Sequence, residues 1–150
     1  MTTSPQTRSD AGLATALRIS VSRLARRMRA QRLASGLEPS LSDTQLAALA
    51  ALVAHDVMTP GELADHEKVQ PPSMTRVIAA LEERGLVLRA PHATDRRQVV
   101  LRPTDQGLEV VRQYRRLREA WLAQRLRELT PQERALLRQA APILEKLSQS

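Results

Sequence analysis

The 150-residue sequence contains no cysteine and no phenylalanine, and it has one tryptophan and one tyrosine. Without cysteine, the chain cannot form disulfides, thiolate metal sites or a thiol redox switch. A core with so few aromatic side chains has to be aliphatic, and leucine and alanine favour helices. No apolar run approaches the roughly 20 residues of a membrane-spanning helix, and residues 1–12 contain no apolar stretch of the signal-peptide type. We therefore expect a mainly helical, cytoplasmic protein of one domain.

The chain also lacks the residue patterns that indicate catalysis. It has no glycine-rich phosphate loop and no His-x-x-x-His metal spacing, and its histidines, His55, His66 and His92, are scattered. No nucleophile–base pair and no carboxylate pair can be placed from the sequence. We expect a protein that is not an enzyme and that needs neither a cofactor nor a metal.

Positive charge is in excess. Lysine and arginine number 23 against 16 acidic residues, which gives a formal net charge of +7. Such an excess is informative about partners rather than about the fold. Nucleic acid is the leading candidate partner, and an anionic membrane surface is the alternative.

Apolar residues recur at helical spacing along most of the chain. Three helix starts are marked by capping boxes, in which a Ser or Thr is followed three residues later by Gln or Glu. These boxes are Ser42 with Gln45, Thr59 with Glu62, and Thr130 with Glu133. The pattern predicts helices over about 11–34, 42–55, 60–67, 71–84, 105–128 and 131–148, the fifth capped by Thr104.

Residues 69–102 predict a DNA-binding arrangement. The helix over 71–84 ends at Gly85, and two β-type runs follow, 86–89 and 99–102, joined by a polar loop. A short helix, a tight join, a second helix and a basic hairpin form a winged helix-turn-helix. In that fold a helix enters the major groove of DNA, and an arm or wing reaches the flanking minor groove.

The helix over 71–84 has the composition of a base-recognising helix. Met74, Val77, Ile78 and Leu81 form its apolar side. Small, polar and basic residues lie off that side, where Arg76 can grip a guanine edge with two hydrogen bonds. The other interpretation is an ordinary solvated face. The residues that we expect to bind DNA from this helix are Gln70, Pro72, Ser73, Thr75 and Arg76.

The segment PPSMTRVIAALEERGLVLR, followed by DRRQVVLRPTDQG, resembles the multiple-antibiotic-resistance regulator (MarR) family. Asp95, Arg96 and Arg97, with the later Val99, Leu101, Thr104 and Gly107, are similar to the wing motif of that family. LSDTQLAALAAL, from Leu41, is similar to the helix that opens its DNA-binding lobe. The resemblance extends from about Leu13 to the end. Gln70 departs from it, because the family often has Ser at this helix cap and Gln caps poorly.

The resemblance implies a mainly α fold with a small β-hairpin wing. It places a DNA-binding lobe at 41–104 and dimerisation helices at 11–40 and 105–148. Apolar stripes on the first, fifth and sixth helices also favour a second copy as partner, although a monomer with an internal three-helix bundle stays open. In the wing, the resemblance implies that Asp95 holds the guanidinium of Arg97 for the minor groove, and Arg96 is expected to contact phosphate.

We therefore expect a homodimeric regulator of transcription, a repressor that binds a pseudo-palindromic operator in double-stranded DNA. The resemblance implies a small aromatic or amphipathic effector between the dimer region and the lobe, with Arg18 and His55 as its polar contacts. Two alternatives stay open. One is a non-specific architectural DNA-binding protein, and the other is a helical interaction protein that does not bind DNA.

Overall fold

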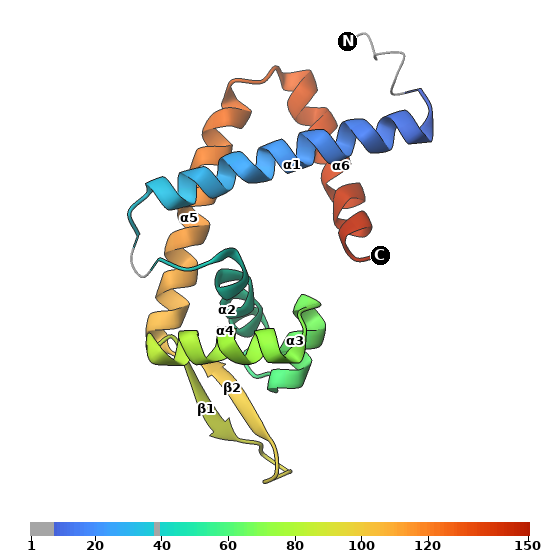
Figure 1. Ribbon diagram of the computed structural model, residues 1–150. Coiled ribbons are helices and arrows are strands. Elements are labelled where there is room, and N and C mark those ends of the chain that lie inside the picture. Colours follow the sequence, from blue (N-terminus) through green and yellow to red (C-terminus); the bar gives the residue numbers. More distant parts are fainter. Residues whose placement is uncertain (1–7, 38–39) are drawn as a thin grey trace. The chain divides into compact units, whose positions relative to one another are not determined.

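The computed structural model describes residues 8–37 and 40–150 (Figure 1). The chain divides into two compact units. Ser35–Arg116 form the winged lobe, and residues 1–34 with 117–150 form the terminal-helix unit. The elements are α1 (Asp10–Ala34), α2 (Asp43–His55), α3 (Pro60–Glu67), α4 (Pro71–Glu83), β1 (Val87–Pro91), β2 (Val99–Pro103), α5 (Asp105–Arg127) and α6 (Pro131–Ser148). The predicted fold class, mainly helical with a β-hairpin wing, is confirmed.

Local capping explains where the helices begin. The hydroxyls of Ser42, Thr59 and Thr130 each accept the backbone N–H three residues later, and the Gln or Glu at that position bonds back to the capping residue. All three predicted capping boxes are therefore confirmed, and each satisfies backbone donors that the first helical turn would leave unpaired. Thr104 caps α5 in a related way, with its hydroxyl accepting the Gly107 amide at 3.1 Å.

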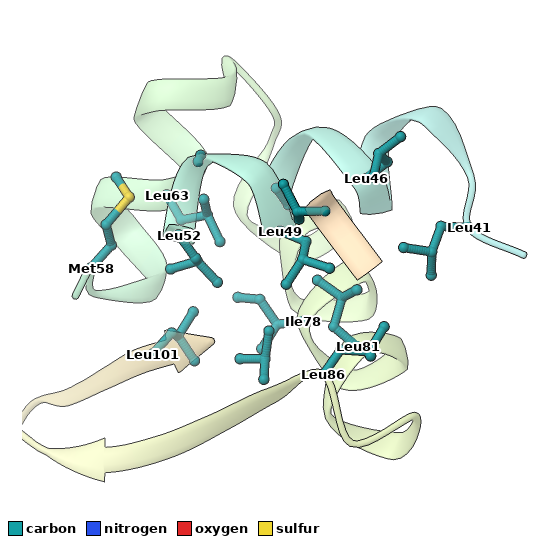
Figure 2. Packing of buried hydrophobic residues seen from close by; sticks show 14 of the residues in the cluster. Leu41, Leu46, Leu49, Leu52, Met58, Leu63, Ile78, Leu81, Leu86 and Leu101 are labelled. Carbon is teal, nitrogen blue, oxygen red and sulfur yellow. The ribbon is translucent and has the colours of Figure 1, made fainter. Parts of the chain in front are cut away.

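The winged lobe has one aliphatic core. Figure 2 shows leucines of α2 meeting Leu63 of α3 and the apolar side of α4. Met74, Ile78 and Leu81 are all buried, as the spacing of the apolar residues predicted, and Val77 is partly buried. Leu86, just before β1, and Leu101, within β2, are completely buried in the same cluster. Through this packing, the core holds α4 and the base of the wing together.

The wing is a two-stranded antiparallel sheet in which Val87 pairs with Pro103 and Pro91 with Val99. Met58 forms a further bridge to Leu101 in both directions, with N···O distances of 3.3 and 2.7 Å. The Thr104 hydroxyl donates to the Gly85 carbonyl at 2.7 Å, which joins the end of β2 to the turn after α4. The Met58 bridge thus joins β2 to the segment before α3, and Figure 1 shows the hairpin between the end of α4 and the start of α5.

The terminal-helix unit exposes much apolar surface. Leu13, Leu17, Val21 and Leu24 of α1 are 37–50% exposed. Five aliphatic residues of α6 are 40–61% exposed, and none of the residues of α6 is buried in the chain as described. One boundary between the terminal-helix unit and the winged lobe falls inside α5. The first half of that helix, with Val110 and Tyr114 buried, packs in the winged lobe.

Candidate nucleic-acid interface

The first half of α4 presents an exposed polar side. Pro72, Ser73, Thr75 and Arg76 are exposed, whereas Met74, between them, is buried. The burial of Met74, Ile78 and Leu81 fixes the rotation of the helix about its axis. Consequently, the residues predicted to contact bases all face solvent on one well-anchored helix.

The start of α4 matches the expectation for Gln70. Gln70 is exposed and lies at the N-cap position, but its side chain makes no capping hydrogen bond, and Pro71 occupies the first helical position. The Thr75 hydroxyl donates to the Pro71 carbonyl at 2.9 Å, which leaves its oxygen lone pairs able to accept. Among the described residues, Arg76 has no hydrogen-bond or ion-pair partner, so its guanidinium donors are available to a ligand.

The join between α3 and α4 is short. Lys68 ends α3 in the left-handed region, with φ 52° and ψ 43°, and its N–H bonds the carbonyls of Ala64 and Asp65. The Val69 amide donates to the Ala64 carbonyl at 3.0 Å. Two residues later α4 begins. This is the predicted helix-turn-helix, held by backbone hydrogen bonds at the turn.

In the wing loop, Asp95, Arg96 and Arg97 are exposed. We expected an ion pair between the Asp95 carboxylate and the Arg97 guanidinium, and among the described residues these two groups form none. Instead, Asp95 Oδ1 accepts the backbone N–H of Arg97 at 3.0 Å. The reason is local, since an Asp in a turn bonds the amide two residues on more readily than a long, mobile side chain. Asp95 therefore shapes the backbone from which the Arg97 side chain extends.

Two contacts in the lobe were not predicted from the sequence. The Nε–H of Arg89 in β1 donates to Glu82 Oε1 of α4 at 2.7 Å, so an ion pair joins the recognition helix to the wing. The imidazole of His92 accepts backbone amides of the wing loop. The first pairs residues seven apart across a turn, and no spacing rule marks it. The second had a signal, a polar side chain three residues before Asp95 in a predicted loop.

The proposed effector contacts lie in separate units. Arg18 borders an apolar groove of about 350 Å³ in the terminal-helix unit, lined also by Leu17, Val21, Leu144, Leu147 and Ser148. His55 lies at the end of α2, where its Nδ1 is 2.9 Å from the Ala51 carbonyl oxygen and its ring meets that of His66 edge-on at 4.9 Å. Over the described ranges, no cluster of three or more His, Asp or Glu residues is arranged to hold a metal ion, and no helix is long and apolar enough to cross a membrane.

The net positive charge does not belong to the winged lobe. Ser35–Arg116 contain ten basic and eleven acidic residues, a net charge of −1, whereas the remainder contains thirteen and five, a net charge of +8. Within the lobe, residues 69–103 have six basic and three acidic residues, and residues 35–68 have one and six. The segment with α4 and the wing is thus basic on a nearly neutral lobe.

Comparison with known proteins agrees with this geometry. Residues 41–99 match the MarR family profile. The helix-turn-helix transcriptional regulator Mb0904 of Mycobacterium bovis is 47% identical over 136 residues, 91% of this chain and 92% of that protein. The transcriptional repressor MdtR of Bacillus subtilis is 30% identical over 134 residues, 89% of this chain and 84% of that protein. The crystal structure of Rv1404 from Mycobacterium tuberculosis superposes with a TM-score of 0.81 at 27% identity, covering 93% of this chain and 94% of that one.

The relatives just described match this chain over nearly its whole length. The winged lobe, with its exposed α4 side and arginine-bearing hairpin, is consistent with their description as helix-turn-helix regulators. The family consists of transcriptional regulators rather than enzymes. The chain belongs to the MarR family of DNA-binding transcriptional regulators.

Proposed function

We propose that the protein is a homodimeric, ligand-responsive repressor that binds a pseudo-palindromic operator. The observation behind this proposal is that Arg76, on the exposed side of α4, and Arg97, in the wing, are both exposed on one lobe. The 30% identical relative MdtR is named a transcriptional repressor, which favours repression over activation.

The proposed dimer follows from the apolar surface of the terminal-helix unit. Leu144 and Leu147 of α6 line a groove with Leu17 and Val21 of α1, and all four side chains are 37–59% exposed. Exposed apolar patches of this kind mark protein interaction sites. A second copy would bury them by a two-fold contact in which the same residues serve both chains. Leu144→Glu would place a charge in this contact. Sedimentation of this variant should then show a monomer, and a DNA-binding titration should show weak operator binding.

In the proposed complex, the two α4 helices lie in successive major grooves, with half-sites about one helical turn or 10 bp apart. Arg76 donates two hydrogen bonds to a guanine, while Pro72 and Ser73 approach base edges or a thymine methyl. Gln70 and Thr75 bond nearby bases or phosphates. Arg97 enters the flanking minor groove, where narrow A·T segments attract arginine, and Arg96 contacts phosphate.

Selection of bound sequences from random duplex DNA tests this proposal, with an inverted repeat as the expected product. On that site, Arg76→Ala should cost about 1–3 kcal/mol and relax the preference at one position per half-site. Arg112→Ala is the matched control, because Arg112 is an exposed arginine of the same lobe that belongs to α5 rather than to α4 or the wing. It removes the same charge and should retain the base preference.

The architectural alternative makes a different prediction. A protein that contacts only the DNA backbone would bind the selected and the random duplexes with similar affinity. Arg76→Ala would then lose as much affinity for the random duplex as for the selected one at fixed salt concentration, and the same would hold for Arg112→Ala. A helical interaction protein would yield no enriched sequence. Either result would overturn operator binding.

The proposed effector is a small aromatic or amphipathic acid, with Arg18 as its polar contact. Arg18 borders apolar walls, an environment that suits an anionic head on an apolar body. An aromatic acid such as salicylate should raise the melting temperature and release operator DNA. Arg18 also borders the proposed dimer contact. Arg18→Gln is therefore compared with the wild type at a concentration at which sedimentation shows both to be dimers, and it should weaken both effects there.

A further inference from the structure

The tip of the wing is organised by one nitrogen atom. His92 Nδ1 lies 3.2 Å from the Thr94 backbone nitrogen and 3.1 Å from the Asp95 backbone nitrogen, and both amides are hydrogen-bonded to it. The Thr94 hydroxyl is 3.3 Å from the same atom. His92 is half-buried, whereas the residues around it in the loop are exposed.

These contacts determine the protonation of the ring. A hydroxyl can donate or accept, but a backbone N–H can only donate, so Nδ1 must accept from Thr94 and Asp95. The imidazole is therefore neutral, with its proton on Nε2. A protonated imidazole has N–H groups at both positions and no acceptor, and it would turn a donor toward the two amide donors.

The bonds form a chain from His92 to the DNA-contacting arginine. The imidazole holds the Asp95 amide, Asp95 Oδ1 holds the Arg97 amide at 3.0 Å, and the Asp95 carbonyl accepts the Gln98 amide at 3.1 Å. The Gln98 carbonyl in turn accepts the His92 amide at 3.1 Å, which closes the loop. A break at His92 therefore frees the backbone that orients both Asp95 and Arg97.

We propose that neutral His92 is a positioning residue for Arg97, and that its protonation loosens the wing and weakens operator binding. This inference rests on the proposed minor-groove contact of Arg97. The charged residues of the wing are Asp95, whose amide the ring holds, Arg96 and Arg97 in the loop, and Arg89 and Arg102 along the strands. Imidazoles as a class take up a proton within the range of about pH 5 to 8, so the pH dependence of binding is measured across that range.

The sign of the pH effect separates this role from simple charge. Protonation of His92 adds a positive charge to an element that faces DNA, and electrostatics alone predicts tighter binding as the pH falls. Loss of the acceptor predicts weaker binding instead. The neutral form, with its hydrogen bonds, is present at the upper end of the range and is lost as the pH falls.

The test compares the full-length chain with His92→Ala, His92→Asn and, as control, His66→Asn. Asparagine offers an acceptor oxygen near the place of Nδ1 and does not titrate in this range. Operator binding is measured at fixed ionic strength at about pH 8 and about pH 5.5. At the higher pH, His92→Ala should bind about three- to tenfold more weakly, the loss expected for one or two hydrogen bonds, and His92→Asn should bind like the wild type.

On acidification, the wild type and His66→Asn should lose about as much affinity as His92→Ala has lost already, and His92→Asn should not. His55 and His66 remain in His92→Asn, so any slope that it retains belongs to them or to the DNA. Wild-type binding that tightens relative to His92→Asn, or a His92→Ala that binds normally at the higher pH, would overturn the proposal.

A readout without DNA keeps this inference separate from the proposed function. Long-range ¹H–¹⁵N spectra of the imidazole should show a bare Nδ1 and a protonated Nε2 at about pH 8. The Thr94 and Asp95 amides should exchange faster in His92→Ala than in His92→Asn. A proton on Nδ1 would overturn the positioning role even in a protein that binds its operator, while the expected spectra with no DNA binding would overturn only the proposed function.

Discussion

Gly107 offers a sharp test of how the lobe is held together. It lies in the first turn of α5, where its amide bonds the Thr104 hydroxyl at 3.1 Å. A Cβ built at this position would overlap the backbone carbonyl oxygen of Leu86 and approach Leu49 Cδ1 to 3.2 Å. The carbonyl cannot rotate away, because it accepts the Thr104 amide at 3.0 Å. The glycine of the wing motif is therefore required for the close approach of α5 to the start of the hairpin.

Two opposing terms decide the effect of Gly107→Ala. Helix propensity alone would stabilise the alanine variant by about 0.5–1 kcal/mol. Forcing a methyl group into a filled space costs about 1–3 kcal/mol, and the upper end applies because the clash is with backbone. We expect a net loss of about 2–2.5 kcal/mol, which lowers the melting temperature of a chain of this size by about 4–10 °C.

Gly61→Ala is the matched control for this measurement. Gly61 lies in the first turn of α3, and a Cβ there would meet only the Thr59 hydroxyl at 4.0 Å. This variant should be unchanged or up to about 0.5 kcal/mol more stable. Urea and thermal unfolding followed by circular dichroism compare the two at one protein concentration. If Gly107→Ala is as stable as Gly61→Ala, α5 does not pack on the hairpin as closely as the contact with Leu86 requires.

Three further outcomes follow from named contacts. Asp95→Ala should weaken operator binding although it removes a negative charge, because the Arg97 amide loses its acceptor; tighter binding in a titration would mean that the wing acts through net charge alone. The amide and hydroxyl of Thr130 lower the pKa of the Glu133 carboxyl, so its contribution to stability is complete above the ordinary pKa and is lost as the pH falls below it. Denaturation between about pH 5 and 3 should show this loss in the wild type and not in Glu133→Gln. Mild peroxide should leave DNA affinity intact, since the chain has no cysteine, and a loss that dithiothreitol reverses would contradict this.

Helices were predictable because their signals are local. A capping box requires a Ser or Thr and a Gln or Glu three residues apart, and both partners bond each other regardless of the rest of the fold. The first strand begins one residue later and ends two residues later than predicted, and the second begins at the predicted residue and ends one residue later. The ladder continues to the Pro91–Val99 pair, while Leu86 turns into the core. Strand ends depend on pairing across the hairpin, which a single run of residues does not reveal.

The candidate site was predictable in composition but not in its internal bonding. The exposed side of α4 follows directly from the spacing of Met74, Ile78 and Leu81, so the position of Arg76 on it was determined in advance. The wing required geometry. Asp95 has two plausible partners in Arg97, the amide and the guanidinium, and only the turn conformation decides for the amide. His92 looked like an isolated residue until folding placed two amides against it.

The charge of the chain shows why composition cannot locate a site. The excess of +8 belongs to the terminal-helix unit, and the lobe that contains the recognition helix and the wing is close to neutral. A dimer would double that excess, and such a field raises the rate of encounter with DNA without selecting a sequence. In the proposed complex, selection would depend on Arg76, whose place is fixed by the core beneath α4, and on Arg97, whose backbone amide is held by Asp95. Net charge and the proposed sequence specificity thus belong to different parts of one small chain, and the net charge of +7 indicates a nucleic-acid partner through residues that lie outside α4 and the wing.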